Sequence, residues 1–140
     1  MKSVTRSAPL DDTGKLILRL VLAGLLLFHG TSKLMHGIDG IVGMVAKQGL
    51  PAFVAYFVYV GEVVAPLLVL VGFLTRPAAL VIAINMVVAV FLVHTGQLLE
   101  LNKAGGWQIE LQAFYFGTAL ALVFLGAGRF SAGGAAGRWN

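Results

Sequence analysis

The stretch KLILRLVLAGLLLFHGTSKL, residues 15–34, decides the fold class of this 140-residue chain. It is almost entirely apolar, and its length is close to the roughly 20 residues that a helix needs to cross about 30 Å of hydrocarbon. It also contains polar side chains that cost free energy inside a membrane: Arg19, His29 and Lys33. The stretch therefore predicts a transmembrane helix that carries functional or structural polar groups.

Three further apolar runs follow, at about residues 52–74, 78–95 and 107–126. They do not alternate between polar and apolar residues, so they predict helices and not the strands of a membrane barrel. The composition agrees, because only 11% of the residues are charged and 59% are hydrophobic, with a mean hydropathy of +0.91. A soluble domain carries about 25% charged residues. We expect an all-α membrane protein, folded as a four-transmembrane-helix bundle.

The segment between the first two runs, residues 37–51, is too short and too polar to span a membrane. Its apolar residues Ile38, Ile41, Val42 and Val45 fall on one helical face. This spacing predicts a short interfacial helix that lies on the membrane surface. The expected organisation is an N-terminal tail (1–14), a transmembrane domain (15–130) and a C-terminal tail (131–140).

The basic residues predict the orientation. With four spans, both termini and the middle loop share one side of the membrane. That side holds seven basic residues (Lys2, Arg6, Lys15, Arg19, Arg76, Arg129 and Arg138), and the other side holds three (Lys33, Lys47 and Lys103). This asymmetry predicts cytoplasmic termini. The positive charge is thereby explained by topology, so we expect no nucleic-acid partner, and we expect the first span to be retained because no small-residue cleavage site follows it.

Two polar residues lie near the middle of predicted spans, Glu62 and Asn85, and others lie near the outer surface: His29, Lys33, His94 and Glu110. Because they come from different spans, the topology predicts a polar funnel that leads from the outer side to a carboxyl group in the bundle core. A buried glutamate can hold or pass a proton, and imidazoles above it can relay protons or hydrogen-bond a carbonyl. Arg19 lies near the cytoplasmic end of its span, and we expect it to extend to the membrane surface.

Each of these residues also has a purely structural interpretation. Lys33, His94 and Glu110 could face lipid headgroups, His29 could be a packing histidine, and Glu62 could hydrogen-bond Asn85 or His29. No pair of ligands sits at metal-binding spacing on one helix, so we predict no metal site. The absence of cysteine excludes disulfides and thiol chemistry. Aromatic residues near Glu62, Tyr59 among them, favour a slot for a lipid-soluble aromatic ligand such as a quinone.

The order and spacing of several short motifs resemble the DoxX family over about residues 15–131. These motifs are Arg19–Lys33, Gly49-Leu50-Pro51, Gly61-Glu62, Gly72–Arg76 with Ala78-Ala79, Asn85-Met86, Gly105-Gly106-Trp107 and Leu125–Ser131. The resemblance implies a small four-helix protein of the bacterial cytoplasmic membrane. The family takes its name from a subunit of a terminal quinol oxidase and thiosulfate:quinone oxidoreductase system, and other relatives are associated with oxidative stress and thiol redox. In the family an acidic residue usually follows the Gly-Gly-Trp motif, and Glu110 is the nearest match here, slightly displaced.

Two functions remain open at this point. The first is a quinone-linked subunit of a membrane redox or oxidative-stress complex, in which Glu62 and His29 are the chemical residues. Lys33, Tyr59, Asn85, His94 and Glu110 would then surround the ligand, and a partner protein would supply electrons because no haem or flavin motif is present. The second is a non-catalytic scaffold, homo- or hetero-oligomeric, that stabilises a partner complex. A proton or small-molecule transporter is a third, weaker interpretation.

Overall fold

Helices dominate the computed structural model, which describes residues 8–140. Helix α1 (Ala8–His36) is followed by the short α2 (Asp39–Lys47). A continuous helical run then covers Ala52–Val71 and is built from η1 (Ala52–Tyr56), α3 (Phe57–Tyr59), η2 (Val60–Val64) and α4 (Ala65–Val71). A second run, Thr75–Gln97, contains α5 (Thr75–Ala89), η3 (Val90–His94) and η4 (Thr95–Gln97), and α6 (Glu110–Leu125) completes the fold.

The all-helical prediction is confirmed for the described residues, which form no strand beyond an isolated bridge between Leu101 and Trp107. Three of the helical runs are long and apolar enough to cross a membrane, namely Pro9–His36, Ala52–Val71 and Thr75–Gln97. The fourth predicted run is shorter in the structure, because Trp107 belongs to a turn and α6 begins at Glu110. That turn is closed by backbone hydrogen bonds from Asn102 to Gly106 and from Gln108 to Glu100.

Two further boundaries differ from the prediction. Helix α1 begins at Ala8, within the segment expected to be an N-terminal tail. Lys2 and Arg6, which contributed to the predicted orientation, lie outside the described residues. The short helix expected between the first two spans is present as α2, bounded by Gly37 and Gly49, both with positive φ angles. Glycine adopts this conformation without the steric cost that other residues incur.

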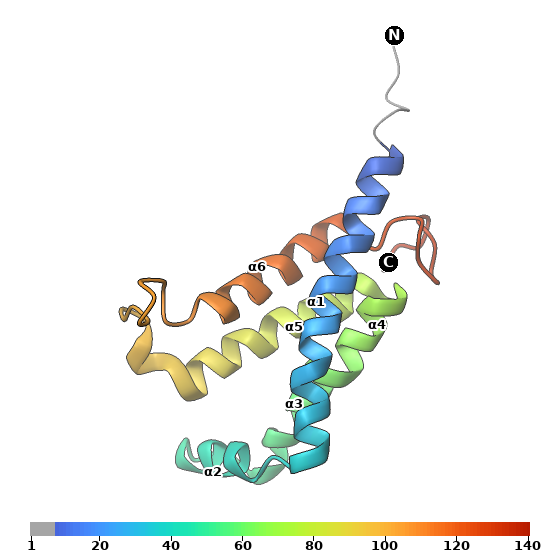
Figure 1. Cartoon of the computed structure of the whole chain (residues 1–140). Helices are drawn as coiled ribbons and strands as arrows, with labels where there is room; N and C mark the ends of the chain where they lie inside the picture. The colour runs from blue at the N-terminus through green and yellow to red at the C-terminus, as the bar shows by residue number, and fades with distance from the viewer. Residues whose placement is uncertain (1–7) are drawn as a thin grey trace.

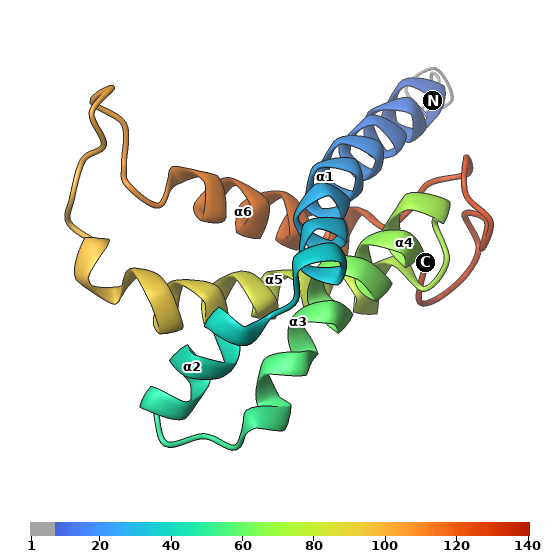
Figure 2. The same ribbon diagram turned by 60° about the horizontal axis from the view of Figure 1, so that its bottom comes forward.

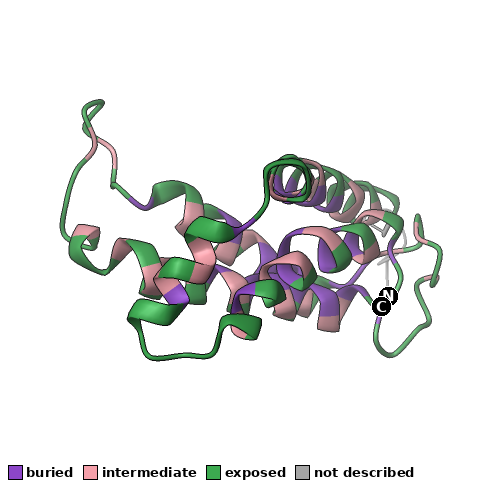
Figure 3. Ribbon diagram, turned by 90° about the horizontal axis from the view of Figure 1, so that it is seen from below, coloured by how far each residue is buried: buried purple, intermediate pink, exposed green. Residues whose placement is uncertain are grey.

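The helices cross near one end of the molecule and diverge at the other. Helices α5 and α6 lie side by side and are joined by loop 98–109 at the far end (Figures 1 and 2). Helix α1 crosses them, with α4 beside it, and α2 lies next to η1 at the start of the Ala52–Val71 run. Buried residues gather where the helices cross, whereas much of the diverging part is exposed (Figure 3).

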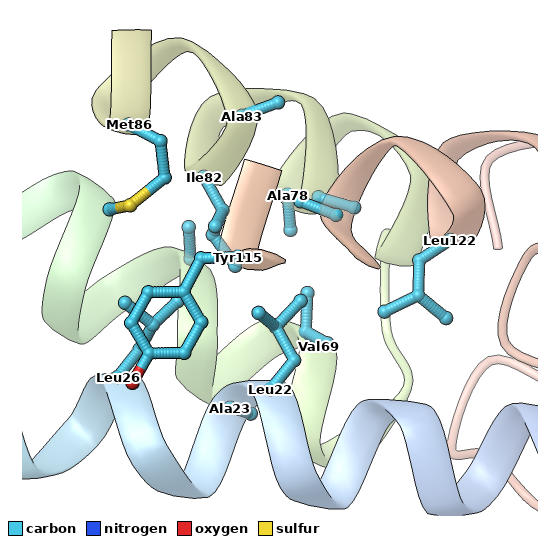
Figure 4. Packing of buried hydrophobic residues seen from close by; sticks show 13 residues of the cluster. Leu22, Ala23, Leu26, Val69, Ala78, Ile82, Ala83, Met86, Tyr115 and Leu122 are labelled. Carbon is cyan, nitrogen blue, oxygen red and sulfur yellow. The ribbon is translucent and has the colours of Figure 1, made fainter. Parts of the chain in front are cut away.

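The main core sits at this crossing and is formed by aliphatic side chains from α1, α4, α5 and α6 around Tyr115 (Figure 4). On α1, Leu22 and Leu26 point into it, one turn apart. Small residues on α5, Ala79 and Ala83, are fully buried and allow the neighbouring helices to approach closely. The core thus fixes the relative positions of the four long helical elements.

Arg19 does not extend to the membrane surface as predicted but is 99% buried, its relative exposure being 1%. Its guanidinium donates four hydrogen bonds to backbone carbonyls at the end of α4 and just beyond α6: Val69 (2.8 Å), Leu70 (2.8 Å), Ala127 (3.0 Å) and Phe130 (2.8 Å). The last carbonyls of a helix have no partner within the helix and carry the negative end of its dipole. A planar cation with several fixed donors suits such a cluster.

A second arginine has the same role at α6. Arg76 donates to the carbonyls of Val123 (2.8 Å) and Phe124 (2.9 Å) through Nη1. Between the two arginines the chain turns at Gly72, whose φ of +73° ends α4. A Cβ atom at Gly72 would collide with the guanidinium of Arg19 and with Ser131. The turn and the buried arginine therefore depend on each other.

We expect Arg19→Lys to destabilise the fold strongly. A lysine ammonium cannot reproduce the planar fork, and each buried carbonyl left without a donor costs about 1–3 kcal/mol. The matched control is Arg129→Lys, because the Arg129 side chain is 52% exposed and pairs with Asp12 at the surface. Such a pair contributes at most about 1 kcal/mol. Thermal unfolding in detergent measures both, and equal melting temperatures for the two variants would contradict the structural role of Arg19.

Candidate functional site

An ion pair between α1 and η2 forms the centre of the candidate site. The ammonium group of Lys33 donates a hydrogen bond to Oε2 of Glu62. Glu62 retains only 7% of its accessible surface, and Lys33 is half-buried. Two opposite charges in an apolar environment compensate each other's loss of hydration. The pair therefore explains how a glutamate is accommodated in the middle of an apolar helical run.

The backbone around Glu62 departs from a regular α-helix. Glu62 lies within η2, a π-helical turn, and such turns occur frequently at functional sites. Two glycines bring neighbouring elements into contact with this turn. A Cβ atom at Gly30 would overlap the carbonyl oxygen of Glu62, and one at Gly61 would overlap the side chain of Asn85. The absence of these side chains holds α1 and α5 against the turn.

A large cavity opens on one side of the ion pair, with a volume of about 570 Å³. Its walls are mainly aliphatic and come from α2, the Ala52–Val71 run and α5 with η3. The polar side chains that line it are Lys33, Glu62 and Asn85. We refer to it below as the apolar cavity.

The amide nitrogen Nδ2 of Asn85 is buried and has no hydrogen-bond partner within the described chain. A buried donor without a partner costs about 1–3 kcal/mol, so its presence needs an explanation. The hydrogen bond from Asn85 to Glu62, considered from the sequence, is wrong, because Glu62 pairs with Lys33 and leaves Nδ2 free. A free donor beside an ion pair at the wall of an apolar cavity is suited to a ligand that has a polar acceptor and an apolar body.

A second, smaller cavity, of about 160 Å³, also adjoins the ion pair. Here polar side chains make up a much larger part of the wall, which contains His29, Gln112 and Tyr115 in addition to Lys33 and Glu62. The imidazole of His29 meets the ring of Tyr115 edge-on, with 6.2 Å between ring centroids. We refer to this space as the polar cavity.

His94 connects the polar cavity to the end of its helix. Its Nδ1 lies 2.6 Å from Oε1 of Gln97, and its Nε2 lies 3.1 Å from Nε2 of Gln112. An amide oxygen only accepts and an amide nitrogen only donates. His94 is thus in hydrogen-bond contact with a glutamine on each side of its ring.

The residues selected from the sequence are thus divided among several places. Lys33 and Glu62 adjoin both cavities, Asn85 faces the apolar cavity and His29 faces the polar one. His94 contacts the polar cavity only through Gln112.

Two further selected residues lie outside both walls, as His94 does. The hydroxyl of Tyr59 donates to the backbone carbonyl of Lys33 (3.3 Å), and the tyrosine lines neither cavity. Glu110 is exposed at the start of α6 and accepts a hydrogen bond from Asn102. The predicted aromatic slot is therefore mostly aliphatic, with Phe57 as its aromatic member.

Sequence reasoning missed Gln112 and Tyr115 as site residues. Both lie on α6, and their position in the wall depends on how α6 packs against α1 and α5. The available signal was weak, since a glutamine near the start of an apolar helix is also typical of a membrane interface. Among residues 8–140, no three histidine, aspartate or glutamate side chains gather closely enough to hold a metal ion.

Comparison with known proteins adds a family. The DoxX family model matches residues 14–95, a segment that contains every residue lining the apolar cavity. A protein of Bacillus subtilis named "Putative oxidoreductase CatD" is 30% identical over 82 residues, which cover 59% of this chain and 60% of that protein. An uncharacterized protein of Haemophilus influenzae is 32% identical over 114 residues, which cover 79% of this chain and 81% of that protein.

The matched part thus spans about 60% of the length of the Bacillus relative. No solved structure matches the chain. The family model covers more than half of the chain, and its match includes the ion pair, both glycines that adjoin it and Asn85. The chain is a membrane protein of the DoxX family.

Proposed function

We propose that this chain is a quinone-linked subunit of a redox complex in the bacterial inner membrane. The observation that carries the proposal is the unpartnered Nδ2 donor of Asn85, which lies beside the Lys33–Glu62 pair at the wall of an apolar cavity. A quinone has a matching shape, with carbonyl acceptors on one end and an isoprenoid chain on the other. The volume of the apolar cavity, about 570 Å³, also suits a ligand of this class, because small-molecule pockets commonly measure about 300–1,000 Å³.

The roles of the side chains follow from their positions. Asn85 donates a hydrogen bond to a quinone carbonyl, and aliphatic walls hold the ring and the chain. A bound quinone supplies the chemistry of accepting or releasing two electrons together with two protons. Lys33 and Glu62 hold protons next to that carbonyl. Electrons pass to or from a partner protein, since the sequence contains no cysteine and no haem or flavin motif. The oxidoreductase name of the Bacillus relative supports this role.

The proposal includes four spans with cytoplasmic termini. Helix α6 has 16 residues, about 24 Å at 1.5 Å per residue, so it crosses the hydrocarbon as a short fourth span. Large apolar side chains such as Phe28, Phe114 and Phe124 are more than two-thirds exposed on the helices, and a lipid environment accounts for them. Helix α2 lies at the membrane surface, and its buried residue Val45 packs in one cluster with Ala55 of η1.

A non-catalytic scaffold is the alternative. It is favoured by the two arginines that clamp helix ends and by the extent of exposed apolar surface available to a partner. In that case the ion pair would serve assembly alone. The scaffold and the redox subunit predict different results for the same substitution of Glu62, as described below.

We expect Asn85→Leu to weaken quinone binding about tenfold or more without destabilising the protein. The substitution keeps the number of side-chain heavy atoms and the branching at Cγ, removes the donor to the ligand and also removes an unsatisfied buried group from the free protein. Binding of a short-chain quinone to the purified protein is measured by ligand-dependent thermal stabilisation. Gln108→Leu, which also replaces an amide side chain by leucine but at an exposed loop position, serves as control. Unchanged affinity in Asn85→Leu would contradict the proposed ligand contact.

Glu62→Gln should abolish quinone-dependent electron transfer in native membranes while the protein accumulates normally. The amide keeps a hydrogen bond to Lys33 but cannot exchange a proton at neutral pH. Glu110→Gln is the matched control, because Glu110 is exposed and lines neither cavity, and it should retain full activity. Normal electron transfer in Glu62→Gln would exclude the mechanism. If Glu62→Gln instead prevents assembly with the partner protein, the result favours the scaffold.

Reporter fusions test the fourth span. A chain truncated after Lys103 and fused to alkaline phosphatase should be active, because the enzyme then lies outside the cytoplasm. The same reporter after Asn140 should be inactive, whereas green fluorescent protein at Asn140 should fluoresce. If both positions report the same side of the membrane, α6 does not span and the four-span topology is wrong.

A further inference from the structure

The Lys33–Glu62 pair separates two spaces of opposite chemistry. Both residues line the apolar cavity and the polar cavity, and Ala89 is the third residue common to the two walls. The apolar cavity adds Asn85 as its other polar residue, whereas the polar cavity adds an imidazole, a primary amide and a phenol. The ion pair is therefore accessible from two sides by different kinds of molecule.

The polar cavity has the size and the groups to hold water. Its volume of about 160 Å³ far exceeds the roughly 10–15 Å³ that one water molecule requires. A buried water also needs two to four polar partners. His29, Gln112 and Tyr115, together with the ion pair, supply donors and acceptors around this space.

A hydrogen-bonded path leads from this cavity toward loop 98–109. Gln112 in the cavity wall contacts His94, which contacts Gln97 at the end of the Thr75–Gln97 run. Both ring nitrogens of His94 have a hydrogen-bond partner, and an imidazole contacted at both nitrogens can pass a proton from one side of the ring to the other. Asn85 adjoins the ion pair from the apolar cavity, whereas His29 and Tyr115 adjoin it from the polar cavity.

We propose that the polar cavity is a hydrated chamber that brings protons from the side of loop 98–109 to the Lys33–Glu62 pair. This inference rests on the proposed quinone function and adds the source of its protons. When the ligand in the apolar cavity takes electrons from the redox partner protein and a proton from the pair, water in the chamber relays one proton from the side of loop 98–109 to the pair. The ammonium and carboxylate are thereby restored, and each proton that leaves is replaced. Lipid-soluble ligand and water thus reach the same pair from opposite sides.

Single cysteines provide a direct test, because the chain contains none of its own. Gln112→Cys places a thiol in the wall of the chamber. Phe114→Cys is the matched control, since it lies two residues away on α6, is 70% exposed and lines neither cavity. The probe is a positively charged, membrane-impermeant methanethiosulfonate reagent, added to membrane vesicles of each orientation. It reacts with thiolates, which form only where water reaches the sulfur.

We expect Gln112→Cys to react at least tenfold faster than Phe114→Cys, and only from the side of loop 98–109. Ala89→Cys, a minimal substitution in the shared wall, should also react from that side, whereas Val88→Cys, which lines the apolar cavity only, should not. Equal or faster labelling of Phe114→Cys, or failure of both chamber cysteines in folded protein, would overturn the proposal. If the chamber cysteines are labelled as expected but the protein binds no quinone, the proposed function is wrong and the hydrated chamber is still supported.

Discussion

Two cations on one face of α1 must be stabilised inside an apolar bundle, and this constraint shapes the rest of the structure. Arg19 and Lys33 are fourteen residues apart, about 21 Å along the axis. Leu22, Leu26 and Gly30 lie between them at helical spacing and are all buried. Burial of this face therefore buries the arginine fully and the lysine in part. The neighbouring helices have to supply acceptors at both levels.

The two cations are compensated in different ways, Arg19 by backbone carbonyls and Lys33 by a carboxylate. Arg19 is held by four neutral carbonyls whose positions are fixed by helix ends. Lys33 is held by one carboxylate that adjoins two cavities, and in the proposed function this pair exchanges protons. Both π-helical turns, η2 and η3, contribute residues to the wall of the apolar cavity.

Sequence reasoning predicted the helical class and the long apolar runs, because apolar length determines these features. It placed Lys33 near the outer surface and Glu62 deeper in the bundle core, whereas the two side chains meet in an ion pair. It could not predict which residues meet. Depth does not give the direction of a side chain around a helix, and a π-turn adds a residue to one turn, which rotates everything that follows by about 100°. Glu110 and Tyr59 lie at suitable heights but point elsewhere. The partners of Arg19 are backbone carbonyls, which every sequence contains and which therefore leave no signal.

The two cavities also differ in which part of the chain builds them. Every residue that lines the apolar cavity falls within residues 14–95, the segment that matches the DoxX family model. The polar cavity is completed by α6, through Gln112 and Tyr115, outside that segment. A side-chain change on α6 can therefore alter access to the ion pair without touching the walls of the apolar cavity.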